Sequence, residues 1–207
     1  GRNDAEEVVR KTQDQAGEIW VGTEGGGLVR FDGARFVSYG TEELLGSSTI
    51  QKILEDREGN LWLTADPEAN GNGLACLDRE RRGFRRYDQD DSLLLSAVND
   101  MALDAAGRIC VGLEAGVSRF DPGPGQFVQN TVEDGLPTTF IWTLAASPRG
   151  PVWLQPLFSQ RLIAWEGETF RLERSPSPPI AFLSGWLADR GGGLWAAAWG
   201  LDTNKNE

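Results

Sequence analysis

The sequence contains no histidine and only two cysteines, Cys76 and Cys110. This composition excludes a zinc site of the usual Cys/His type and argues against a disulfide-stabilised scaffold. It also removes the side chain that most often acts as a general base near neutral pH. A G-x-S-x-G nucleophile motif and a phosphate-binding P-loop are missing as well. We therefore expect a protein that is not an enzyme and that needs no cofactor.

Long apolar runs and an excess of basic side chains are missing too. No stretch of about 18 apolar residues occurs, so no membrane-spanning helix is expected. The 31 acidic and 20 basic side chains give a formal net charge of −11. Phosphate backbones and anionic lipid surfaces attract basic faces, which this composition does not favour. We therefore expect no nucleic acid partner and no membrane insertion by this chain.

The sequence is organised by a repeat of Asp, two residues, Gly, two residues and Trp. The Trp position of the five copies falls at Trp20, Trp62, Cys110, Trp153 and Trp195, so one copy carries Cys there. Successive copies are 42, 48, 43 and 42 residues apart, and the segments between them are rich in glycine and strand-forming residues. Periods of about 40–50 residues with strand-like content are typical of β-propellers.

The chemistry of each copy predicts a tight turn followed by a strand. An Asp side chain bonds back to nearby backbone, and Gly accepts the backbone angles that follow. We expect the Trp to fill the gap between neighbouring wedge-shaped sheets. A carboxylate ends a later strand of each unit and is expected to form a turn rather than a catalytic set. These carboxylates are Asp32, Asp78, Asp121 and Glu166.

These spacings predict an all-β chain with blades of four antiparallel strands in one domain over residues 1–207. Four units are complete, with a strand remnant at residues 6–10 and a first strand at 194–198, so about five blades are represented. We predict an incomplete arc of a larger propeller, with a strained five-blade ring as the alternative. The chain begins with Gly1 and shows no signal peptide. We therefore expect a piece of a longer protein, or a chain that pairs with another through its open edges.

Several segments resemble the two-component regulator propeller repeat. They are Gly17–Thr23 (GEIWVGT), Gly27–Asp32 (GLVRFD), Asp56–Trp62 (DREGNLW) and Glu133–Pro137 (EDGLP), and the resemblance extends over nearly the whole chain. It implies a seven-bladed propeller in the periplasmic or other extracytoplasmic part of a bacterial signalling protein, commonly a sensor kinase. Many such domains are thought to sense carbohydrates.

The expected function is therefore a non-catalytic, ligand-sensing module for a small molecule or glycan. A propeller scaffold that binds other proteins is the alternative, and a propeller lyase or hydrolase is a remote one.

Residues that break the repeat are the candidates for ligand binding. Trp142 occupies a position that is polar in the other copies, and an exposed indole there would stack on a sugar or a base. Phe140 and Phe182 share another position and suggest an aromatic cluster with Trp142. Gln155 replaces a small residue and would face the central channel if its strand is innermost. For each of these residues, local packing or simple solvation is the alternative interpretation.

One longer hairpin echoes the start of a calcium-binding loop. Its alternating polar residues are Asp66, Glu68, Asn70 and Asn72, with Gly71 between the last two. Leu77 stands where the twelfth-position Glu is required, and Pro67 interrupts the pattern. We therefore expect a flexible turn and no metal site. Elsewhere, Arg30 and Arg119 share one position and are expected to point outward as structural cations.

Overall fold

The computed structural model describes residues 8–41, 45–65, 73–93, 97–147, 149–157, 159, 161–173, 183–188 and 194–198, with backbone alone at 8–9, 89 and the last two segments. Sheet 1 holds β1 (Val8–Gln13), β2 (Ile19–Thr23), β3 (Leu28–Phe31) and β4 (Phe36–Tyr39). Sheet 2 holds β5 (Ile50–Glu55), β6 (Leu61–Ala65), β7 (Leu74–Leu77) and β8 (Phe84–Tyr87).

Sheet 3 holds β9 (Val98–Leu103), β10 (Ile109–Leu113), β11 (Val117–Asp121) and β12 (Gln126–Asn130). Sheet 4 holds β13 (Ile141–Ala146), β14 (Val152–Pro156), β15 (Leu162–Glu166) and β16 (Thr169–Glu173), and β17 (Leu183–Ala188) pairs with β18 (Leu194–Ala198). All neighbouring strands are antiparallel. Short 3-10 turns, η2 (Gln89–Asp91) and η3 (Val132–Asp134), follow sheets 2 and 3.

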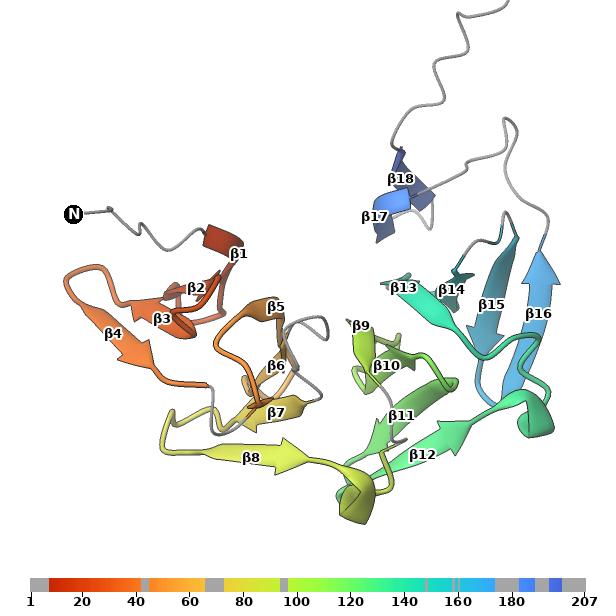
Figure 1. Cartoon of the computed structure of the whole chain (residues 1–207), viewed down its shortest axis with the longest axis horizontal. Coiled ribbons are helices and arrows are strands. Elements are labelled where there is room, and N and C mark those ends of the chain that lie inside the picture. Colours follow the sequence, from red (N-terminus) through yellow and green to blue (C-terminus); the bar gives the residue numbers. More distant parts are fainter. Residues whose placement is uncertain are drawn as a thin grey trace, which may run out of the picture.

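The sheets follow one another around an open arc, as Figure 1 shows. The first strands β1, β5, β9, β13 and β17 contact their counterparts in the next sheet and form the inner edge. The fourth strands lie on the outer rim. The predicted blades of four strands, the four complete units and the incomplete arc are therefore confirmed.

The boundary between units differs from the one expected from the repeat. The strand before each Asp-Gly turn forms a hairpin with the Trp strand after it, so it opens a sheet instead of closing one. The Trp strand is consequently the second strand of its sheet. This arrangement follows from chain order, because a tight turn joins antiparallel neighbours while a longer connection crosses from the outer rim to the next inner strand.

The turn of the first copy shows why Asp, Gly and Trp recur together. The Asp14 carboxylate accepts hydrogen bonds from the backbone N–H of Glu18 at 2.9 Å and from the Trp20 indole N–H at 2.8 Å. The N–H of Gly17 donates to the Asp14 carbonyl, and Gly17 has a φ of 86°, which disfavours any side chain. One carboxylate thus fixes both the turn and the orientation of the indole.

Later copies keep the turn, but the side chain that donates to the Asp carboxylate changes from Trp to Arg in the third copy. Trp62 donates to Asp56 at 2.8 Å, as in the first copy. In the third copy, where Cys110 replaces Trp, the Arg108 guanidinium donates to Asp104 through Nε at 2.8 Å. An arginine therefore satisfies the carboxylate oxygen that an indole satisfies elsewhere.

The gaps between sheets hold the hydrophobic core. Trp20 of sheet 1 is fully buried against sheet 2, and Trp62 of sheet 2 packs against sheet 3. Around Trp62, the rings of Tyr87, Phe120 and Phe127 lie with centroids 5.0–6.4 Å from it. These contacts confirm the predicted gap-filling role for the first two Trp positions, and the side chain of Trp195 lies outside the described part of the chain.

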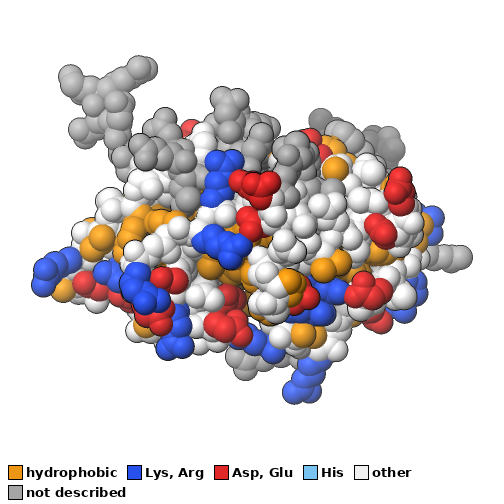
Figure 2. Space-filling view, turned by 90° about the horizontal axis from the view of Figure 1, so that it is seen from below, with side chains coloured by type: hydrophobic (Ala, Val, Ile, Leu, Met, Phe, Trp, Pro, Cys, Tyr) orange, Lys and Arg blue, Asp and Glu red, His pale blue; other side chains and the backbone are white. Residues whose placement is uncertain are grey.

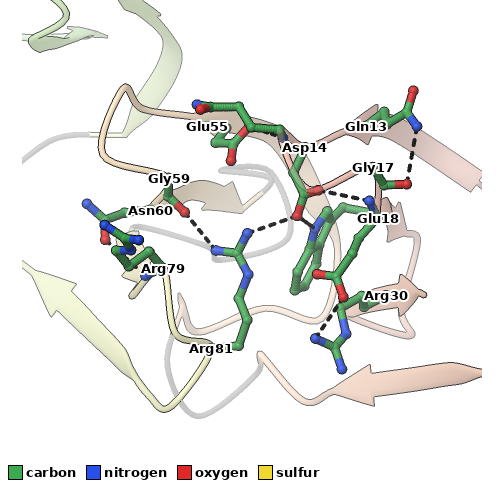
Figure 3. A network of polar contacts seen from close by, with 12 residues as sticks. Gln13, Asp14, Gly17, Glu18, Arg30, Glu55, Gly59, Asn60, Arg79 and Arg81 are labelled. Carbon is green, nitrogen blue, oxygen red and sulfur yellow. Dashed lines mark hydrogen bonds and ion pairs between the residues drawn. The ribbon is translucent and has the colours of Figure 1, made fainter.

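A set of polar contacts joins sheets 1 and 2 at the end of the sheets where the Asp-Gly turns lie (Figure 3). Arg81 extends from the β7–β8 hairpin, and its Nη2 contacts the Asp14 carboxylate at 2.9 Å. Its Nη1 donates to the Gly59 carbonyl at 2.9 Å, and its guanidinium lies 5.0 Å from the centre of the Trp20 ring. The Asp14 side chain is completely buried, so the two sheets share one desolvated ion pair.

The outward face of sheet 1 lacks the cover that the equivalent faces have. Ile19 is 40% exposed and Phe36 72% exposed, whereas Leu61, at the position of Ile19 in sheet 2, is fully buried. Sheets 2, 3 and 4 are each covered by the preceding sheet, which explains the difference. On the side shown in Figure 2, acidic and basic side chains are interspersed over the described surface, with no continuous basic area.

Replacing Asp14 by Ala is expected to destabilise the protein by about 3 kcal/mol, because it leaves the buried Arg81 guanidinium and Trp20 indole without their acceptor. Chemical denaturation measures the change. Asp32→Ala removes an exposed turn carboxylate and serves as the control, with a smaller expected loss. Equal losses in both variants would contradict a special role for the buried carboxylate.

Stability is expected to fall in acid partly through Asp14. Burial raises the pKa of the Asp14 carboxyl, but the hydrogen bonds from Trp20, Glu18 and Arg81 outweigh it and hold the pKa below the ordinary value of 3.8. The unfolded state therefore takes up the proton first, and the stabilisation is lost as the pH falls below 3.8 through the folded-state pKa. Thermal melting across this range should show a smaller decrease in Tm for Asp14→Asn than for the original sequence.

Candidate ligand-binding site

Each innermost strand carries a β-bulge near its start. The pairing of β5 with β6 skips Gln51, that of β9 with β10 skips Asn99, and that of β13 with β14 skips Trp142. Gln51, Asn99 and Trp142 occupy the same position of the repeat, and Trp142 is the aromatic exception among the three. A bulge redirects the side chain of its extra residue away from the regular ladder. The bulged residues therefore form a related set along the inner edge of the arc.

The aromatic candidates are placed at this bulge. Trp142 is 43% exposed, and its ring lies 6.5 Å from that of Phe140 with an angle of 27° between the planes. Phe140 is partly buried and directly precedes β13. The structure thus brings these two sequence-predicted residues together as an accessible stacked pair, and Phe182 lies outside the described residues.

A polar network runs beside the aromatic pair between the inner strands. Asp100 on β9 forms an ion pair with Lys52 on β5. The same carboxylate accepts hydrogen bonds from Thr143 Oγ1 and the Leu144 N–H on β13, each at 2.7 Å. A second backbone N–H, that of Met101, donates to it at 2.9 Å. Asp100 therefore ties three sheets together at the inner edge.

The bulged residues extend this network along the arc. The Asn99 side chain donates to the Ile141 carbonyl at 3.0 Å, and Arg10 donates to the Gln51 carbonyl at 2.8 Å. Sequence reasoning did not identify Asp100 or Lys52 as site residues. The signal available was that these two residues and Thr143 occupy one position of the repeat with opposite charges and a hydroxyl.

Gln155 lies on β14, which is the second strand of sheet 4 and not the innermost one. The condition attached to its predicted role, an innermost strand, is therefore not met. Its side chain is buried, at 7% exposure, rather than solvated. Arg119 is likewise buried at 8% exposure, so the expectation that it points outward is wrong. Its guanidinium turns into the gap between sheets 3 and 4, where it lies 5.3 Å from the centre of the Trp165 ring.

Three of the four turn carboxylates, those of Asp32, Asp78 and Asp121, bond to their turns as predicted, whereas at Glu166 the backbone carbonyl accepts a bond from Thr169. Asp32 accepts hydrogen bonds from the N–H groups of Ala34 and Arg35, and these bonds hold its pKa below the ordinary value. Asp78 and Asp121 accept similar backbone bonds. Such carboxylates are already engaged by the backbone of their turns.

No group of three or more metal-ligating side chains occurs in the part of the chain that the structure describes. The calcium-like residues Asp66, Glu68, Asn70 and Asn72 lie outside that part. Within it, no helix is long and apolar enough to cross a membrane.

The two thiols are held in their protonated form by burial. Desolvation raises the pKa of Cys76 to about 12, and it raises that of Cys110 further above the ordinary range. Both cysteines are unpaired. They have the character of packing residues, not of nucleophiles.

The folded protein is accordingly expected to resist alkylation. At about pH 8, iodoacetamide should label both cysteines at least about tenfold more slowly in the folded protein than in urea, because the raised pKa suppresses both thiolates and Cys110 is also buried. Mass spectrometry of timed samples measures the rates. Rapid labelling of Cys76 in the folded state would contradict the raised pKa of its thiol.

Comparison with solved structures places this arrangement of sheets among known folds. A virginiamycin B lyase from Staphylococcus aureus superposes with a TM-score of 0.75 at 13% identity, covering 96% of this chain and 65% of the lyase chain. The fold is that of a β-propeller. The chain spans less than two thirds of the lyase structures it matches, so the described strands correspond to part of a larger ring.

Two further similar structures are a domain of a signalling protein and an enzyme. An extracellular domain of BT3049 from B. thetaiotaomicron, described as a hybrid two-component system, superposes with a TM-score of 0.73 at 20% identity, covering 93% of this chain and 27% of that one. A gluconolactonase from Xanthomonas campestris gives 0.64 at 13% identity, covering 91% and 68%. No family model matches the sequence, and no curated protein matches it. At these identities the likeness establishes the fold alone.

Proposed function

We propose that this chain is the ligand-sensing propeller module of a bacterial two-component-type signalling protein, located outside the cytoplasm, and that it binds a glycan or a similar small polar ligand. The observation that carries the proposal is the accessible Trp142–Phe140 pair at a bulge that holds Gln51 in sheet 2 and Asn99 in sheet 3. The repeat's resemblance to two-component regulator propellers supports the signalling role. The extracellular sensor-type domains among the similar structures support the same role and location.

The chemistry of the aromatic pair suits a sugar ring. An indole face packs against the C–H groups of a pyranose, while polar groups beside it bind the hydroxyls. Asn99 lies on the neighbouring inner strand β9 and Gln51 on β5, one sheet further along, and both bring amide groups to the inner edge of the arc. An aromatic platform next to amide donors and acceptors is therefore the arrangement expected for glycan recognition.

Binding without catalysis is the reading that the carboxylates favour. Asp100 lies on β9, the inner strand next to that of Trp142. Its buried carboxylate is engaged by Lys52, Thr143 and two backbone N–H groups. These four contacts commit the Asp100 carboxylate to joining the inner strands. The likeness to a lyase and a gluconolactonase is a likeness of fold, and a shared fold does not imply a shared activity.

A scaffold that binds another protein, or a further copy of this chain, is the second candidate. It is favoured by the exposed face of sheet 1, where Phe36 and Ile19 lie at positions that are covered in the following sheets. An apolar sheet face of this kind is suited to a second sheet rather than to a small polar molecule.

A glycan array probed with the purified chain tests the sensing proposal. We expect binding to at least one class of glycan, and we expect Trp142→Ala to weaken it by about tenfold or more through loss of the stacking face. Phe36→Ala, which alters another exposed aromatic residue, is the matched control and should leave binding unchanged. Absence of glycan binding, or equal binding by the Trp142 variant, would contradict the assigned site. A loss of glycan binding with Phe36→Ala alone would place the glycan site on sheet 1 instead.

A further inference from the structure

Two adjacent gaps between sheets each contain a pocket at the end of the Asp-Gly turns. The pocket between sheets 2 and 3 has a volume of about 600 Å³, and the pocket between sheets 3 and 4 has a volume of about 380 Å³. Their walls come from equivalent places in the repeat. The first is lined by Trp62 and Phe120 where the second is lined by Cys110 and Trp165. The two pockets can therefore be compared residue by residue.

The comparison shows that arginine has replaced uncharged residues in the second pocket. Asn60, Cys76 and Ala106 line the pocket between sheets 2 and 3. Arg108, Arg119 and Arg149 stand at the equivalent positions between sheets 3 and 4. The number of acidic side chains in the lining falls from three in the first pocket to two in the second. They are Asp56, Glu58 and Asp78 in the first and Asp104 and Glu166 in the second. The lining of this pocket thus has three guanidinium groups, whereas that of the pocket between sheets 2 and 3 has two, from Arg85 and Arg108.

The arginines differ in how far they are already neutralised. Arg108 is paired with Asp104, through Nη2 at 2.7 Å and Nε at 2.8 Å. Arg119 is buried, and it contacts the Gly167 carbonyl and the largely exposed carboxylate of Glu168. Arg149 is exposed, and within the described chain no hydrogen bond or ion pair involves it. Arg149 is therefore the guanidinium of this pocket that is left without a partner among the described residues, and the Glu166 carboxylate lines the same pocket.

A second observation comes from Trp165, which lines the same pocket. This residue is only 3% exposed, and its indole N–H has no hydrogen-bond acceptor among the described residues. The Arg119 guanidinium lies 5.3 Å from the centre of its ring. A buried donor without an acceptor is unfavourable, and native sites that contain one commonly receive an acceptor from a ligand or from water. The wall of the pocket thus lacks one acceptor oxygen.

We propose that the pocket between sheets 3 and 4 is a binding site for a small oxyanion, namely a carboxylate, sulfate or phosphate group. Arg149 supplies the unpaired charge, and the Arg119 guanidinium and the Trp165 indole supply further donors. The Cys110 substitution makes the site possible, because Arg108 satisfies the Asp104 carboxylate that an indole satisfies in sheets 1 and 2. The site lies at the opposite end of the inner strands from Trp142 and does not depend on glycan binding there.

Titration with defined anions tests the site. Inorganic phosphate, sulfate and glucuronate are added in separate experiments to the purified chain in a buffer that contains none of them. We expect saturable binding of at least one probe, with an affinity that decreases as sodium chloride is raised. We also expect a shift of the Trp165 indole N–H resonance, assigned from its disappearance in Trp165→Phe. Preference among the three probes separates an inorganic anion from an acidic sugar.

Substitutions separate this site from general charge attraction. Arg149→Gln should weaken binding by about tenfold, because it removes the unpaired guanidinium at the mouth. Arg82→Gln removes an exposed arginine outside the pocket and should leave the affinity unchanged. Both altered arginines are exposed, so the variants are expected to fold. The absence of saturable binding for all three probes, or equal affinity in Arg149→Gln and the original chain, would overturn the proposal.

Discussion

The fold depends on filling the wedge-shaped gap between successive twisted sheets. Strand twist makes neighbouring four-stranded sheets diverge from the inner edge toward the outer rim, so each gap requires a large side chain that is held in one orientation. In the first two sheets an indole supplies the volume, and the carboxylate of the preceding turn fixes it with a hydrogen bond of 2.8 Å. The turn and the core are therefore stabilised by the same Asp side chain.

This constraint explains why so few residues are free for function. Turn carboxylates, Trp residues and inner-strand hydrophobics are all committed to repeated structural roles. Where a repeat departs from its pattern, the departure is accommodated locally. Trp142 lies at a bulge of the kind that every described inner strand contains. Arg108 donates to the Asp104 carboxylate, which has no indole donor in its copy of the repeat. Both candidate sites arise at such departures, at opposite ends of the inner strands.

Sequence reasoning succeeded where the interaction is local. The Asp-Gly turn, the strands on each side of it and the turn-forming role of Asp32 follow from residues within a few positions of one another. It failed where partners are far apart in the chain. The ion pair of Lys52 with Asp100 spans 48 residues, and the contact of Arg119 with Glu168 spans 49. Neither pairing could be assigned without knowing which strand lies innermost.

The sequence by itself determined the blade, because period, turn chemistry and strand propensity are encoded within each unit of 42 to 48 residues. It also singled out Trp142 as a departure from the repeat. The tertiary structure alone decided that the strand before each turn is the inner one and that Trp142 sits on a bulge. It alone decided that Gln155 and Arg119 are buried and that arginines gather around Trp165. The physical reason is that these features depend on how one sheet stacks on the next, and that stacking joins residues more than 40 positions apart.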